Sequence, residues 1–226
     1  MTICSFKHLN YRNTLLFFGV LFCFISSITA QTPADFYSKP LTKTYEQAFK
    51  DIDSIRQLGL TQTQKNLAIK VKRDAIRDGQ IGYYAKALNV EVECIEALSE
   101  YDEKNSLVYR FFLQEIQSVQ KPFKSVAHLY MAQVLSSAYS DYQSENAVFT
   151  DTSSDFSSWS KSFLSMKVKE HILNALLYAD AVPFSDELLP LANTKADSTG
   201  YLLKLSLKAM VAERAIGILK SISDLE

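Results

Sequence analysis

Residues 81–98 read IGYYAKALNVEVECIEAL, and this stretch is apolar on two sides of a helix. Residues three and four positions apart share a side of a helix, so the apolar residues sort into two rows. The first row holds Ile81, Ala85, Leu88, Val92 and Ile95, and the second holds Ala87, Val90, Cys94 and Ala97. Two apolar sides need two neighbours to bury them. The pattern therefore predicts an inner helix with other helices packed on both sides.

Helical periodicity also extends through the residues before this stretch. A first helix is predicted from Tyr45 to Gly59, with Leu60 placed to cover its end. A second helix follows, which we expect Thr61 to cap and Gly79 to end. Glycine suits the left-handed backbone that often follows a helix. Both turns are short, which predicts antiparallel neighbours.

Four more long helices are expected after residue 98. The first opens at Asp102 or Asn105 and ends at Lys121-Pro122, because proline disfavours a helical residue before it. A polar loop is expected at 143–158. The other long helices cover about 122–142, 159–179 and 201–219, with a short helix at 185–189.

The sequence therefore predicts an all-α fold, in which residues 42–220 form a single helical domain. Antiparallel helices joined by short turns build either an α-solenoid or an irregular bundle. The first and third helices are about 38 residues apart, close to a tetratricopeptide period. The full repeat signature is absent, so "tetratricopeptide-like" describes only the geometry.

The first thirty residues have the order of a secretory signal peptide. Lys7 and Arg12 precede an apolar run at 15–25, and small residues lead to a cleavage point before Gln31. We expect residues 31–41 to form an extended leader and the mature chain to be exported, to the periplasm, the cell envelope or the medium. The apolar run is shorter than the roughly 20 residues of a membrane span, so no membrane insertion is expected after cleavage.

Cysteine positions follow the same division. Cys4 and Cys23 lie in the signal segment, which leaves Cys94 alone and allows no internal disulfide. A lipid-attachment role for Cys23 is the alternative. The bulky Phe22 before it and Phe24 after it do not fit such a site, which has small residues before the cysteine and polar ones after it.

Size and charge restrict the class of partner. Removal of residues 1–30 leaves 196 residues, enough for one domain with its own core. Two of the 24 basic residues are lost with the signal segment, so 22 basic and 25 acidic residues give a net charge of −3. A weakly acidic chain without a basic stripe does not fit a nucleic acid partner.

The chain offers few candidates for catalysis. His128 and His171 are the only histidines after the signal segment, and each lies alone on its own predicted helix. An enzyme would need one of them to meet a carboxylate or a serine in a pocket. We therefore predict no catalytic, cofactor-binding or metal-binding residue. Four carboxylates on one helix are expected to form a solvated face: Glu91, Glu93, Glu96 and Glu100.

Two other features are interpreted structurally. Trp159 is the only tryptophan, and it follows the polar loop and opens a long helix, so we expect it to anchor both onto the core. The serines of 153–162 fit helix capping and a loop. Asp197-Ser198-Thr199 resembles the acceptor motif of Bacteroidetes O-glycosylation, a short and unspecific signal.

Several segments match one family in order and spacing. Tyr45 to Phe49 opens an aromatic and acidic helix that ends at Leu58-Gly59-Leu60, and Tyr84 to Leu88 gives a Lys-Ala-Leu helix core. The polar loop, Trp159 with its long helix, and Pro183 to Leu189 follow in order. Over about residues 42–220 this order resembles the helical N-terminal region of large alpha-2-macroglobulin-like proteins of Bacteroidetes.

The resemblance implies an interaction module related to an endopeptidase inhibitor. Family members trap proteases with a bait region, β-sandwich domains and often a thioester. Here Cys94-Ile95-Glu96-Ala97 has alanine where the thioester needs glutamine, so we interpret Cys94 as a core cysteine. We expect a non-enzymatic module that does not inhibit by itself and whose partner is a protein or downstream macroglobulin domains. An independent tetratricopeptide-like envelope scaffold that binds a protein is the alternative.

Overall fold

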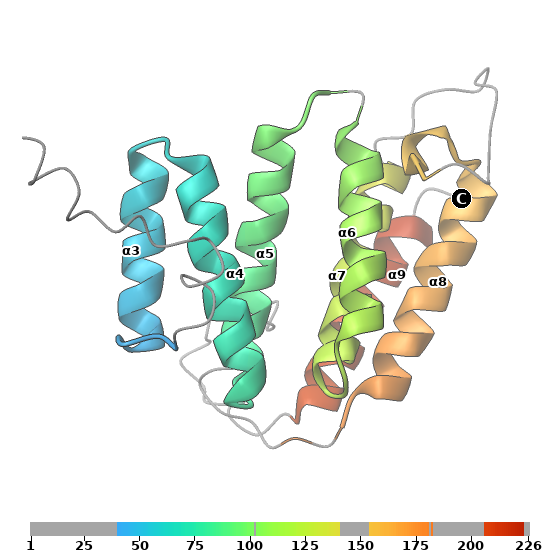
Figure 1. The fold of residues 1–226 in the computed structure, drawn as a ribbon. Helices are drawn as coiled ribbons and strands as arrows, with labels where there is room; N and C mark the ends of the chain where they lie inside the picture. The colour runs from blue at the N-terminus through green and yellow to red at the C-terminus, as the bar shows by residue number, and fades with distance from the viewer. Residues whose placement is uncertain (1–39, 102, 141–153, 181, 183–205, 224–226) are drawn as a thin grey trace, which may run out of the picture. The chain divides into compact units, whose positions relative to one another are not determined.

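The computed structural model describes residues 40–101, 103–140, 154–180, 182 and 206–223, and the compact helical unit begins at Leu41. All regular structure in these residues is helical, which confirms the predicted all-α class. Seven α-helices and one short 3-10 helix are found in this part of the chain (Figure 1). They are α3 (Tyr45–Gln57), α4 (Thr61–Arg77), α5 (Ile81–Leu98), α6 (Lys104–Ser118), α7 (Phe123–Ser140), η1 (Phe156–Ser158), α8 (Lys161–Tyr178) and α9 (Leu207–Ser223).

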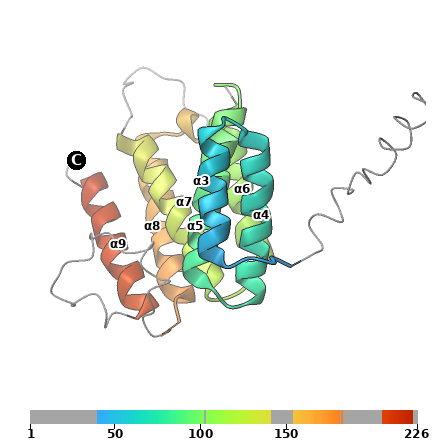
Figure 2. The ribbon, with the colours of Figure 1, turned by 90° about the vertical axis from the view of Figure 1, so that its left-hand side faces the viewer.

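Helices α3 to α8 form an array in which each α-helix packs against the next one along the chain. In Figure 1, α3 lies at one edge of this array and α8 at the opposite edge. Helix α9 then packs back against α7 and α8, as Figure 2 shows from a second direction. The predicted helical array is confirmed, with α9 as an additional helix behind its last members.

Two glycines end the first two helices, as the sequence predicts. Gly59 has φ +69° and Gly79 has φ +75°, the left-handed conformation that other residues rarely adopt. Beside them, the backbone N–H of Leu60 donates to Ile55 O at 3.3 Å, and that of Gln80 to Ala75 O at 2.8 Å. These bonds satisfy carbonyls at the helix ends. The side chain of Leu60 is half exposed, so it covers the end of α3 only in part.

Helix α5 buries both of its apolar rows, in two separate clusters. Its first row joins a large core with residues of α6, α7, α8 and α9: Ile81, Ala85, Leu88, Val92 and Ile95. Its second row joins a smaller core with α3 and α4: Ala87, Val90 and Cys94. Ala97 is exposed, because it lies in the last turn of α5, so its predicted place in the second row is wrong. The predicted inner helix is otherwise confirmed.

Helix α7 is the centre of the large core. It packs against α5, α6, α8, α9 and η1. A helix with neighbours on nearly every side must be apolar on nearly every side, and most residues of its middle are buried. They are Val126, Ala127, Leu129, Tyr130, Met131, Ala132 and Leu135.

Some helix ends differ from the prediction. Thr61 is the first residue of α4 rather than its cap, and Leu60 in the cap position makes no side-chain hydrogen bond. Helix α6 begins at Lys104, between the two predicted starts. The end of the predicted polar loop is the 3-10 helix η1, whose Phe156 is buried. Helix α9 continues to Ser223, past the expected end of the domain at 220.

The first residues of the helical unit are attached to α4. The backbone N–H of Leu41 donates to Oδ2 of Asp74 at 2.8 Å, and Arg77 donates to the other oxygen of the same carboxylate. Asp74 is fully buried, so these partners satisfy its charge. The predicted signal peptide, residues 31–39 of the leader, loop residues 143–153 and the short helix at 185–189 lie outside the described residues.

The prediction of a solvated acidic face on α5 is wrong for one residue. Glu91 is 3% exposed, whereas Glu93 and Glu100 are exposed and Glu96 is intermediate. Lys72 Nζ of α4 lies 3.0 Å from Glu91 Oε1 and 2.7 Å from Glu115 Oε2 of α6. Tyr84 donates to Glu115 Oε1 at 3.0 Å. One partly buried lysine therefore joins α4, α5 and α6.

The buried lysine network is acidic on balance, because one ammonium faces two carboxyl groups. Burial raises the pKa of Glu91 from 4.5 to about 7, although Lys72 acts in the opposite direction. The folded state therefore favours protonated Glu91, and the stability that this contributes is lost as the pH rises from about 4.5 to 7.

Glu91→Gln imitates the protonated residue and should raise the free energy of unfolding at pH 8 by about 1–2 kcal/mol. The gain should shrink by pH 5, where folded Glu91 is already protonated. Urea unfolding at both pH values measures it. The matched variant Glu115→Gln should instead destabilise the protein, because it removes the carboxylate that Lys72 and Tyr84 both contact. A gain for Glu91→Gln that is equal at both pH values would contradict this account.

Candidate functional site

Trp159 lies in the large core between η1 and α8. It is 1% exposed, and three aromatic rings meet it edge to face. The ring centroids of Tyr109 and Phe163 are 5.0 and 4.9 Å away, and that of Phe156 is 6.4 Å away. This places α6, η1 and α8 around one indole. The contribution of Trp159 to stability stays a prediction.

Capping side chains fix the chain on both sides of this tryptophan. Asp155 Oδ1 accepts from the backbone N–H of Ser157 at 3.0 Å and so caps η1. Ser160 Oγ accepts from the N–H of Phe163 at 3.3 Å and caps α8. The interpretation of these serines as capping residues therefore fits the geometry at Ser160.

The two histidines do not lie alone, contrary to the expectation from sequence. Nδ1 of His128 on α7 is 2.9 Å from Nδ1 of His171 on α8, and both residues are 6% exposed. The ring of Tyr178 stacks on His128 with 5.6 Å between centroids. A short contact between two ring nitrogens requires one to donate a proton and the other to accept it, so the neutral pair holds two different tautomers.

Burial keeps both imidazoles neutral. It lowers the pKa of His128 to about 4, and the nearby His171 and Lys124 act in the same direction. It also lowers the pKa of His171 to about 4, with Glu170 opposing and Lys167 adding to the shift. A neutral, buried pair whose two Nδ1 atoms satisfy each other is suited to packing between α7 and α8.

Three exposed apolar residues lie together on the outward side of α8. Met166 is 49% exposed, and Leu173 and Leu177 are each 67% exposed. Steps of seven and four residues place these three in a row on one face of a helix, over about 16 Å. Lys169 and Glu170 lie on the same face and are exposed. We call these five residues the α8 surface.

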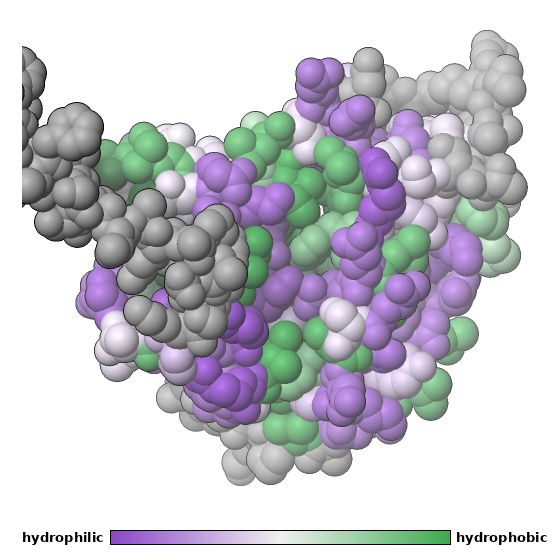
Figure 3. Space-filling view, in the orientation of Figure 1, coloured by the Kyte–Doolittle hydropathy of each residue, from purple (hydrophilic) through white to green (hydrophobic). Residues whose placement is uncertain are grey.

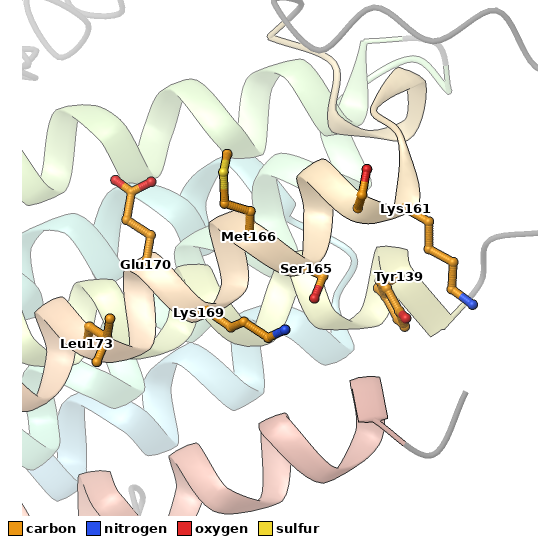
Figure 4. Close-up of a pocket in the computed structure, with 8 residues that line it drawn as sticks. Tyr139, Lys161, Ser165, Met166, Lys169, Glu170 and Leu173 are labelled. Atoms are coloured by element: carbon orange, nitrogen blue, oxygen red, sulfur yellow. The ribbon is translucent and has the colours of Figure 1, made fainter. Parts of the chain in front are cut away.

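A groove of about 770 Å³ runs along α8 and includes part of this surface. Tyr139 of α7 contributes to it, and α8 provides the other lining residues that the structure describes: Lys161, Ser162, Ser165, Met166, Lys169, Glu170 and Leu173. In Figure 4, Met166 and Glu170 point toward one margin of this face of α8, and Lys169 points toward the opposite margin. Figure 3 shows hydrophobic residues among hydrophilic ones along the edge where α8 lies.

The groove combines apolar contact area with charges at its margin. Glu170 pairs with Lys167 at 2.7 Å, and this hydrogen bond lowers the pKa of the Glu170 carboxyl. Lys161 Nζ lies 4.8 Å from the ring centroid of Tyr139. The groove lining among the described residues contains neither histidine, so the pair at α7 and α8 lies apart from it. Exposed apolar area with charged residues at its margin is typical of protein interaction surfaces.

Cys94 is buried in the smaller core. Burial raises the pKa of its thiol above the ordinary value, which keeps the sulfur protonated and unreactive. Asp197-Ser198-Thr199 lies outside the described residues. Within the described ranges, no three metal-binding side chains come together, and no helix has the length and hydropathy to cross a bilayer.

Comparison of the chain with models of protein families, with curated proteins and with solved structures finds no match.

Sequence reasoning missed both the α8 surface and the histidine pair. The exposed row has a signal in the sequence, because α8 carries Met166, Leu173 and Leu177 opposite the apolar face that it buries. A helix that is apolar on both sides implies a second neighbour, as for α5. The histidine pair has no local signal, because its two members are 43 positions apart on different helices.

Trp159→Ala should lower the free energy of unfolding by about 3–5 kcal/mol, because it leaves a cavity between three aromatic rings. Thermal unfolding followed by circular dichroism measures the loss, and the folded spectrum should remain helical. Trp159→Phe keeps part of the contact and should lose less. An unchanged melting temperature for Trp159→Ala would show that the indole does not anchor η1 and α8.

The histidine pair should make the fold less stable in acid. Both pKa values are lower in the folded state than the ordinary 6.5, so their contribution is complete above pH 7 and decreases as the pH falls from 6.5 to 4. Between pH 7 and 5 we expect a loss of about 4 kcal/mol from the pair, with about 2 kcal/mol from each histidine.

The double variant His128→Gln/His171→Gln serves as the reference, because its amides do not titrate. A reference is needed because Glu91 changes stability in the opposite direction over the same pH range, and it does so in both proteins. At each pH, the free energy of unfolding of the double variant is subtracted from that of the unmodified protein. The decrease in this difference from pH 7 to pH 5 is the loss that the histidine pair causes. A difference that is constant with pH would contradict the assignment of a neutral pair.

Proposed function

We propose that this chain is an exported, non-enzymatic helical module that binds another protein through the α8 surface. The observation that supports this most directly is the row formed by Met166, Leu173 and Leu177, three large apolar side chains exposed on one face of a helix. Clustered apolar exposure of this kind is typical of interaction sites. Charged residues beside the row, Lys169 and Glu170, provide the polar rim that protein interfaces usually have.

The two ends of the helical array support the same proposal. All exposed residues within α3 are polar: Glu46, Gln47, Lys50, Asp53, Ser54, Arg56 and Gln57. A polar outer face is what a terminal helix needs when nothing packs on it. The outer face of α8 lacks this property. The outer face of α3 is therefore suited to contact with water, whereas the outer face of α8 is suited to contact with another protein.

The resemblance to alpha-2-macroglobulin-like proteins leads to one candidate partner, namely macroglobulin domains encoded after this segment. On that proposal the helical module stands at the N-terminal side of an endopeptidase inhibitor and packs on its next domain. The alternative is an independent tetratricopeptide-like envelope scaffold that binds a separate protein. Both functions use the α8 surface, and neither needs a catalytic residue.

DNA sequence after the codon for Glu226 separates these two functions. Macroglobulin domains in frame, or encoded by the adjacent gene, would support the inhibitor-related module. Unrelated genes at this position would contradict it and favour the independent scaffold.

Photo-crosslinking tests the interaction itself. A benzophenone amino acid in place of Leu177 should give a covalent adduct with a protein in the compartment to which the source cells export the chain. The same amino acid in place of Lys50, on the polar face of α3, should give none. Mass spectrometry identifies the adduct, including one with a second copy of this chain. Equal adduct formation at both positions, or none at Leu177, would contradict a docking role for the α8 surface.

A further inference from the structure

We propose that the partner of the α8 surface is a second copy of this chain, with the two α8 helices packed antiparallel about a two-fold axis. This inference rests on the proposed function, because it names the occupant of the same surface. In a two-fold interface, residue i of one copy meets residue j of the other, and the reverse contact also forms. A surface that pairs with itself must therefore be complementary to its own antiparallel image.

The α8 surface meets this condition in one register. When Lys169 of one helix faces Glu170 of the other, Met166 faces Leu173, and Ser162 faces Leu177. All six residues lie on one face of the helix, at steps of three and four positions. Each apolar residue of the α8 surface then meets an uncharged residue, and each charged residue of this surface meets one of opposite charge. The antiparallel arrangement also opposes the two helix dipoles favourably.

Exposure and existing contacts leave these residues accessible. Glu170 already accepts from Lys167 within its own helix, with about half of its side chain exposed. A carboxylate has two oxygens and can accept a second ammonium. Lys169 is exposed and makes no ion pair with another described residue. Neither charge must leave a buried network to reach the partner.

The expected association is weak. One helix face on each copy is small beside the roughly 1,600 Å² of a standard interface, so we expect a dissociation constant on the order of 100 μM. Exposed ion pairs add little to affinity, but like charges at the same positions oppose binding. The charges therefore determine register and orientation, while Met166, Leu173 and Leu177 supply the contact area.

Reversal of single charges tests the register. In a homodimer of Lys169→Glu, two carboxylates face each other at two places. In a homodimer of Glu170→Lys, two ammonium groups do so. The dissociation constant of each variant alone should therefore rise at least about tenfold. In an equimolar mixture, the two adjacent acidic side chains of the first variant face the two adjacent basic side chains of the second. The mixture should therefore form a heterodimer. Sedimentation velocity over a range of concentrations measures all three cases.

Two further measurements separate the contribution of apolar contact from that of charge. Leu173→Ser should weaken the dimer in any salt, because it removes contact area. The defects of the two charge variants should decrease in 1 M salt, where exposed charges are screened over about 3 Å. Thermal unfolding should remain close to that of the unmodified protein for every variant, since the replaced side chains are exposed.

Several results would overturn the second copy as occupant. One is a folded chain that stays monomeric well above 100 μM, the order of magnitude expected here. Another is a dimer that Lys169→Glu, Glu170→Lys and Leu173→Ser leave unchanged, and a third is a mixture no better associated than its components. These results leave the proposed function untouched, because crosslinking from Leu177 to a different protein tests it separately.

Discussion

Helix α5 must bury two apolar faces at once, and the arrangement of the other helices follows from this constraint. One face packs on α3 and α4, and the other packs mainly on α6 to α9 with Ala75 of α4 at its edge, so the two cores meet at α5. Buried charge lies at the same junction, where Lys72 of α4 holds Glu91 of α5 and Glu115 of α6. Removal of either neighbour would expose one face of α5 and leave a buried charge without its partner, and both losses are costly. The cores should therefore depend on each other.

Helix α8 also has two apolar faces, but no neighbour in the described part of the chain covers the second one. Helix α8 buries Leu164, Val168 and Ile172 on one side and exposes Met166, Leu173 and Leu177 on the other. Exposed apolar area of this kind gains free energy from a partner. The function that we propose, recognition of a protein and in particular of a second copy, assigns a partner to this face. On that proposal the histidine pair and the lysine network support the structure and take no part in recognition.

Much of the fold could be predicted from sequence, because helix periodicity is a local signal. The two rows of α5 and the glycine turns at 59 and 79 follow from residues a few positions apart. Contacts between distant positions could not be predicted in this way. Glu91 and Glu93 look equivalent in the sequence, but only Glu91 faces Lys72, which is 19 positions away. His128 meets His171 only because α7 and α8 pack side by side. The α8 surface could have been predicted from its two apolar sides, but a row of exposed residues does not name its partner.

The dependence of the two cores on each other can be measured with two natural probes, in a chain without residues 1–30. Cys94 is then the only thiol and lies in the smaller core, whereas Trp159 is the only tryptophan and lies in the large one. Labelling of Cys94 by a thiol reagent under native conditions gives the free energy of opening of its core, and Trp159 fluorescence in urea gives that of global unfolding. The account predicts that the two free energies are equal, because α5 cannot leave one core without exposing the other. A clearly smaller free energy for Cys94, with Trp159 still in its native environment, would contradict it.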